Sequence, residues 1–130
     1  MAGKLLKGRS FLVIDDEQST IDIVKEVLTQ NGADAKGITT PSKGFGMMAN
    51  DSYDAIILDR YMPDVDGHDI LKQLKDHPNM KAVPVIMLTG ESNSAEILKS
   101  IELGASGYVV KPFTPRSFLA QLKKILKLDD

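Results

Sequence analysis

The sequence predicts an α/β fold in which helices cover both faces of a five-stranded parallel sheet. Short apolar runs alternate along the chain with longer stretches whose apolar residues recur at helical spacing. The apolar runs are continuous, which is typical of strands that are buried on both faces. With 130 residues the chain has the length of one domain. An eight-stranded barrel needs about 250 residues, so we expect an open sheet.

Five runs are expected to form the strands. Three of them are strongly apolar, the run at 33–38 is weak, and the run at 83–88 has Pro84 near its start. Crossovers between parallel strands should be right-handed. The predicted strands are 11–14, 33–38, 55–58, 83–88 and 108–110.

Five helices are expected, one after each strand. In the first, Ser19 with Asp22 three residues later is expected to cap the start, and Gly32 to end the helix. The second opens at Pro41 and contains two glycines, each of which costs about 1 kcal/mol in a helix. The last opens at Pro115, because proline is favoured in the first helical turn.

Composition restricts the class of function. The net charge is −2, with no sign of a phosphate-binding stripe, so direct nucleic-acid binding is not expected. Cysteine is absent, which excludes disulfides and thiolate metal sites and fits a cytoplasmic location. No apolar run approaches the roughly 18 residues of a membrane span, so membrane insertion is not expected either. We expect a single domain over 1–130, with 1–8 as a loosely held arm.

Polar residues follow four of the predicted strands at their carboxyl ends, where open parallel sheets bind ligands. A single aspartate after a strand is usually a turn or helix cap. Polar residues of complementary kinds at four strand ends indicate a site instead. These residues are Asp15, Asp16, Asp59, Thr89 and Lys111.

The charges of this set indicate what it binds. Three carboxylates and one ammonium leave two excess negative charges, which a divalent cation would neutralise. Hard oxygen ligands without His or Cys favour Mg²⁺ or Mn²⁺. A lysine and a hydroxyl group are suited to hold the oxygens of a phosphoryl group. The set therefore predicts phosphoryl chemistry, with a carboxylate as the candidate nucleophile.

Four motifs stand in order along the chain. They are Val-Ile-Asp-Asp-Glu at 13–17, Leu-Asp at 58–59 with Met-Pro at 62–63 and Asp-Gly at 66–67, Met-Leu-Thr-Gly at 87–90, and Gly-Ala at 104–105 leading to Gly-Tyr-Val-Val-Lys-Pro-Phe at 107–113. Each motif is weak alone, but the four together are highly specific. With them, the chain from about 9 to 128 resembles the receiver domain of bacterial two-component response regulators. The resemblance implies a flavodoxin-like fold with strand order 2-1-3-4-5. The chain looks like a stand-alone receiver similar to the chemotaxis regulator, or the receiver of a longer protein.

The resemblance implies a phosphoacceptor and a metal site. Asp59 would accept a phosphoryl group from a histidine kinase or a phosphotransfer protein. Asp16 would bind Mg²⁺ directly, and Asp15 mainly through water. The main-chain carbonyl of Tyr61 would complete the metal site together with Asp59.

The resemblance also implies a switch. Thr89 and Lys111 would bind phosphoryl oxygens, and the Lys-Pro peptide bond would be cis. Tyr108 would follow Thr89 inward as the aromatic switch residue. Tyr61 and Glu91, two residues after the acceptor and after Thr89, would tune the lifetime of the phosphoryl group.

The surface expected to change consists of the fourth helix, the fifth strand and the fifth helix, where Lys99, Tyr108 and Lys123 should lie. A downstream protein or a second copy of the domain is expected to bind there. Outside that surface, His68 and His77 are interpreted as surface residues. Arg60, beside the acceptor, is interpreted as a solvated side chain.

These features favour a phosphorylation-controlled binding module that assists its own phosphorylation and dephosphorylation, rather than an enzyme. A hydrolase with an aspartyl-phosphate intermediate usually has a second aspartate where this chain has Tyr61. A flavodoxin-like cofactor binder would need a phosphate loop after the first strand, where the acidic residues at 15–17 would repel a phosphate. A receiver-like protein that is never phosphorylated remains a further alternative, against which the intact acidic set argues.

Overall fold

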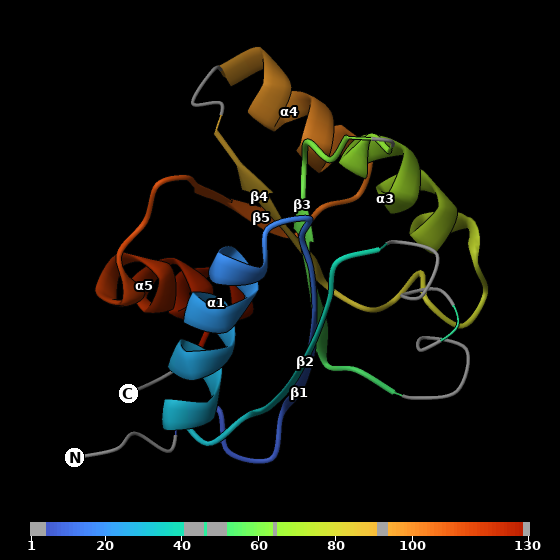
Figure 1. Cartoon of the computed structure of the whole chain (residues 1–130). Helices are drawn as coiled ribbons and strands as arrows, with labels where there is room; N and C mark the ends of the chain where they lie inside the picture. The colour runs from blue at the N-terminus through green and yellow to red at the C-terminus, as the bar shows by residue number, and fades with distance from the viewer. Residues whose placement is uncertain (1–4, 41–45, 47–51, 64, 91–93, 129–130) are drawn as a thin grey trace.

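Strands and helices alternate in the computed structural model, which describes residues 5–40, 46, 52–63, 65–90 and 94–128 (Figure 1). The five strands form one sheet in the order β2-β1-β3-β4-β5, and all neighbours are parallel, which confirms the predicted sheet. The strands are β1 (Ser10–Ile14), β2 (Asp34–Ile38), β3 (Ala55–Asp59), β4 (Val85–Thr89) and β5 (Gly107–Val110). The helices are α1 (Gln18–Gln30), α3 (Gly67–Asp76), α4 (Ser94–Glu102) and α5 (Pro115–Leu126).

Helices lie on both faces of the sheet: α1 and α5 on one, α3 and α4 on the other (Figure 1). Successive strand residues point to opposite faces, so β1 supplies Phe11 and Val13 to one apolar cluster and Leu12 and Ile14 to the other. The first cluster contains apolar residues of α1 and α5, and the second those of α3. This two-sided burial explains why the strand runs are continuously apolar.

Helix ends agree with the sequence at two places and differ at one. α5 opens at Pro115, as predicted, and Thr114 caps it in a reciprocal pair with Ser117. Gly32 follows the end of α1 with a φ of +93°, which favours glycine, so it ends the helix as expected. The prediction that Ser19 caps α1 is wrong. The helix already begins at Gln18, and its cap residue has no capping side-chain hydrogen bond.

Two strands extend further than the apolar runs suggested. Asp59 and Thr89 are the last residues of β3 and β4 rather than the first residues after them. β4 begins at Val85, directly after Pro84, because proline has no N–H to donate to a neighbouring strand. The second predicted helix, opened at Pro41, lies almost entirely outside the described residues.

The N-terminal segment is held more closely than expected. Leu6 is fully buried in the cluster formed with α1 and α5, and its N–H donates to the carbonyl of Asn31. Over residues 5–8 the segment is therefore not a loose arm, because its leucines cover apolar surface. Within the part of the chain that the structure describes, no helix is long and apolar enough to cross a membrane.

Candidate functional site

The register of the sheet brings the predicted polar residues to one edge. Asp59, at the end of β3, pairs in register with Leu88, one residue before Thr89. The N–H of Lys111 donates to the carbonyl of Thr89 at 2.7 Å, which joins the ends of β4 and β5. Asp15 directly follows β1, the other neighbour of β3. Residues far apart in sequence thus meet at the carboxyl ends of four neighbouring strands.

The Lys111 ammonium group lies between two buried carboxylates. Its Nζ is 2.9 Å from Asp15 Oδ2 and 3.2 Å from Asp59 Oδ1. Asp15 is fully buried and Asp59 is 4% exposed, so both carboxylates have little water to solvate them. The second oxygen of Asp15 accepts a hydrogen bond from the N–H of Glu17. Asp15 therefore supports the turn after β1 and also belongs to the charged site.

Asp59 has an unusual protonation equilibrium in the metal-free protein. Burial, followed by the negative charge of Asp15, raises the pKa of Asp59 from 3.8 to about 7. Lys111 opposes this rise through its charge and its hydrogen bond. A hydrogen bond with the Asp16 side chain adds to the rise, which places Asp16 beside the acceptor. The three aspartates predicted as one set therefore interact directly.

The environment of Lys111 keeps that side chain charged. Burial alone would lower the pKa of Lys111, but its hydrogen bond with Asp15 and the charges of both aspartates outweigh burial and raise it. The Lys111–Pro112 peptide bond is cis, as the resemblance implied. Lys111 thus offers a fixed positive charge, 21% exposed, at the opening of the site.

The acidic groups after β1 fit a divalent cation. Carboxylate oxygens of Asp15, Asp16 and Glu17 lie within 4.8 Å of one another. Such a set of oxygen donors without nitrogen or sulfur suits Mg²⁺ or Mn²⁺. Glu17 was not among the predicted ligands, although its position directly after the two aspartates could have indicated it. Asp59 adjoins this set through its hydrogen bond with the Asp16 side chain.

The other predicted residues that the structure describes lie on β4, just beyond β3 and on β5. Thr89 is buried at the end of β4, and Tyr61 is 50% exposed just beyond β3. Tyr108 is half-buried on β5, where it pairs in register with Met87 and packs against the cluster on the α3 side. Glu91, the second predicted lifetime residue, lies outside the described residues.

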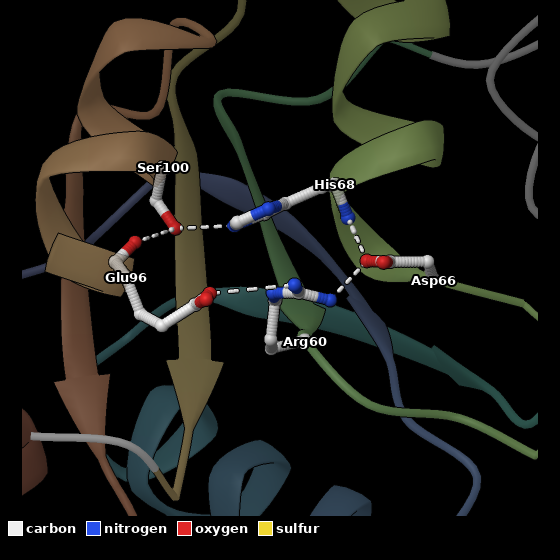
Figure 2. Close-up of polar contacts among 5 residues, drawn as sticks. All are labelled: Arg60, Asp66, His68, Glu96 and Ser100. Atoms are coloured by element: carbon white, nitrogen blue, oxygen red, sulfur yellow. Dashed lines mark hydrogen bonds and ion pairs between the residues drawn. The ribbon is translucent and has the colours of Figure 1, made fainter. Parts of the chain in front are cut away.

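Two interpretations of charged residues near the acceptor are wrong. Arg60 is 9% exposed and not solvated, because its guanidinium group pairs with Asp66 and Glu96. His68 is 6% exposed, and its Nε2 lies 2.7 Å from Ser100 Oγ. Burial, followed by the positive charge of Arg60, lowers the pKa of His68. Both side chains lie between α3 and α4 (Figure 2). His68 is three residues before the buried Leu71 of α3, and this helical spacing could have indicated its burial, whereas no local pattern marks Arg60. His77 is exposed, as expected.

Comparisons with known proteins agree with this geometry. The family description "Response regulator receiver domain" matches residues 11–123. The transcriptional regulatory protein GltR of Pseudomonas aeruginosa is 32% identical over 120 residues, which cover 92% of this chain and 50% of GltR. The chain thus spans about half the length of such curated relatives.

Solved structures show the same fold. The chemotaxis response regulator CheY4 of Vibrio cholerae matches with a TM-score of 0.85 and 26% identity, over 90% of this chain and 98% of that one. The BeF3-activated DrrB receiver domain matches with a TM-score of 0.78 and 31% identity, over 92% of this chain and 97% of that one. The predicted flavodoxin-like arrangement is therefore confirmed.

Proposed function

Because the chain belongs to the response regulator receiver domain family, we propose that it is the phosphoacceptor of a two-component phosphorelay and that Asp59 carries the phosphoryl group. The observation that carries this proposal is the Lys111 ammonium group between the buried carboxylates of Asp15 and Asp59. A structural ion pair needs one carboxylate. The second carboxylate, that of Asp59, has a raised pKa, which supports a site that binds a further cation or a phosphoryl group.

In the proposed reaction an Asp59 carboxylate oxygen attacks the phosphorus atom of a phosphohistidine on a kinase or phosphotransfer protein. An oxygen–phosphorus bond forms and the phosphorus–nitrogen bond breaks. The electron pair stays on the imidazole nitrogen of the donor, which then takes up a proton. Lys111 is placed to pair with a phosphoryl oxygen, since its Nζ already lies 3.2 Å from Asp59 Oδ1. Thr89, at the end of the next strand, is the proposed hydroxyl donor to another phosphoryl oxygen.

The proposed cofactor is Mg²⁺, with Mn²⁺ as a substitute. Asp15, Asp16 and Asp59 would hold it, with the main-chain carbonyl of Tyr61 as a further ligand and Glu17 close by. When bound, the cation supplies charge neutralisation at the phosphoryl oxygens. The carboxylates themselves fix its position, because Asp15 is held by both Lys111 and the Glu17 N–H.

The proposed output surface is formed by α4, β5 and α5. Leu98 and Ile101 on α4 are 58% and 43% exposed, and their spacing of three residues puts both on one face of the helix. A groove there is lined by Ile101, Tyr108 and Lys124 among others. Lys123 lies on α5, whereas Lys99 lines a different groove, between α3 and α4. A downstream protein or a second copy of the domain is the proposed partner, and cytoplasm the proposed location.

Intact-mass measurement tests the phosphoacceptor assignment. The protein is incubated with a small phosphodonor such as acetyl phosphate and with Mg²⁺, and one phosphoryl adduct is expected. Asp59→Asn should lose the adduct while keeping the fold, because the amide is nearly isosteric with the carboxylate. Asp34→Asn, on the exposed edge strand β2, is the matched control and should label like the wild type. An Asp59→Asn protein that labels normally would disprove the assignment.

Mg²⁺ and the switch residue are tested with the same assay. Chelation of Mg²⁺ should abolish labelling. Thr89→Ala should still accept the phosphoryl group but transmit little change to α4 and β5, measured by amide chemical shifts. If the wild type labels equally well with and without Mg²⁺, the cofactor assignment is wrong.

A further inference from the structure

The attachment of α4 to the rest of the domain is mainly polar. Ser100 is the one buried residue among the nine of α4, all of which the structure describes. Two of the helix's large apolar side chains, Leu98 and Ile101, are exposed instead. An element that buries so little apolar surface is held weakly by the hydrophobic effect. Its position therefore depends on the polar contacts that it makes.

These contacts join α4 to the start of α3 and to the residue after the acceptor (Figure 2). Arg60 forms ion pairs with Asp66, the cap of α3, and with Glu96 of α4, the latter at 3.4 Å. His68 Nε2 lies 2.7 Å from Ser100 Oγ, which itself donates to the main-chain carbonyl of Glu96. Figure 2 shows all five side chains gathered between the two helices. We call this set the α3–α4 polar cluster.

Arg60 is the member of the cluster that directly follows the acceptor in the chain and contacts α4 through its side chain. Its main-chain N–H donates a hydrogen bond to β4, and its carbonyl accepts one from Gly67 of α3. Its side chain is only 11% exposed, so its ion pairs are less screened by water than surface pairs are. Glu96 makes the longer of the two contacts, and both acidic side chains are partly exposed, Asp66 at 44% and Glu96 at 42%.

We propose that Arg60 is a positioning residue that holds α4 through Glu96 in the phosphoryl-free protein and releases it on phosphorylation. The inference rests on Asp59 as the proposed phosphoacceptor. A phosphoryl group there adds negative charge one residue before Arg60 and competes with Glu96 for its guanidinium group. Glu96 and a phosphorylated Asp59 thus favour different positions of Arg60. Such a difference in contacts is what allows a modification to shift a population.

A phosphoryl mimic measures this competition. Binding of fluoroberyllate with Mg²⁺ to Glu96→Gln should be about two- to fivefold tighter than to the wild type, the range for a partly exposed ion pair. Simple destabilisation would not tighten binding. Glu102→Gln, an exposed acid on the same helix, is the matched control and should bind like the wild type. In an Arg60→Met background the Glu96→Gln change should have no effect, because its partner is gone.

Hydrogen exchange of the α4 amides gives a second measurement that needs no phosphoryl mimic. Both Arg60→Met and Glu96→Gln should speed exchange across α4, and Glu102→Gln should not. The proposal is overturned if Glu96→Gln binds the mimic like Glu102→Gln, or if its effect persists in the Arg60→Met background. A wild type that binds no mimic would instead disprove the proposed function. In that case hydrogen exchange still tests the role of Arg60: if α4 exchanges equally fast in the wild type and in Arg60→Met, Arg60 does not hold the helix.

Discussion

Gly67 tests how closely the start of α3 is packed against the acceptor. It is the first residue of α3, it is buried, and its N–H donates to the carbonyl of Arg60 at 2.8 Å. A Cβ atom at this position would lie 2.9 Å from Arg60 Cα and 3.0 Å from Arg60 O, and nearer still to the carbonyl oxygen of Asp59. These neighbours are main-chain atoms that cannot rotate away. Gly67→Ala must therefore move the start of α3 or the acceptor segment.

The expected cost follows from two opposing effects. Extra atoms in a packed interior cost about 1–3 kcal/mol. Alanine gains up to about 1 kcal/mol over glycine in a helix, and less at its first residue. The net loss in the free energy of unfolding should be about 1–2 kcal/mol. Urea denaturation should show a lower midpoint, by roughly 1 M for a typical slope of about 1–3 kcal/mol per molar.

Phosphoryl-mimic binding separates this effect from general destabilisation. Gly67→Ala should also weaken fluoroberyllate binding, because the displaced atoms belong to Asp59 and Arg60. Gly107→Ala is the matched control: its Cβ would contact the side chain of Ile125, away from the acceptor, at 2.5 Å. That variant should lose stability but keep its affinity. A Gly67→Ala protein as stable as the wild type would refute the reasoning.

Three further predictions concern single side chains. Asp59 binds its proton more tightly in the folded, metal-free protein (pKa about 7) than when unfolded (3.8), so the contribution of Asp59 to stability should fall as pH rises across that interval. Urea denaturation in the presence of a chelator should show that Asp59→Asn removes this dependence of stability on pH. An unchanged dependence would contradict the raised pKa of Asp59. His68 has a lowered pKa, so the contribution of His68 to stability should fall as pH drops below about 6.5. His68→Gln should not show this pH-dependent loss in the free energy of unfolding, whereas His77→Gln, at an exposed position, should still show it. If the two variants give the same dependence of stability on pH, the argument from burial of His68 is wrong. Tyr61→Asn should speed loss of the phosphoryl group, and a tenfold effect needs only about 1.4 kcal/mol. Equal decay rates in a phosphate-release assay would exclude Tyr61 as a shield.

The sheet and the acceptor centre could be predicted because their signals are local in the sequence. A strand buried on both faces needs consecutive apolar residues, and residues 55–58 supply them. Parallel strands then bring their carboxyl ends together, so Asp15, Asp59 and Lys111 meet without further information. The start of α1 was misplaced because Ser19 resembles a capping residue. In the structure the turn held by Asp15 begins the helix earlier.

The α3–α4 polar cluster could not be predicted because its members are buried by packing between elements. Arginine and histidine are residue types that are common at protein surfaces, and Arg60 lies after β3, outside any helix whose periodicity could mark it as buried. Their partners Glu96 and Ser100 lie 36 and 32 residues away in the sequence. Only the placement of α4 beside α3 brings them together. Burial of polar residues at such a helix contact depends on tertiary geometry, which periodicity does not encode.

The weak apolar attachment of α4 bears on how a partner and a phosphoryl group would affect each other. A partner that covers Leu98 and Ile101 gains apolar burial only in the α4 position that it fits. If that is the position released by Arg60, partner binding and phosphorylation favour the same state. Each must then strengthen the other by the same factor, since coupling between two binding sites is reciprocal. The partner should therefore raise fluoroberyllate affinity in the wild type, and raise it less in Glu96→Gln, where part of the shift has already occurred.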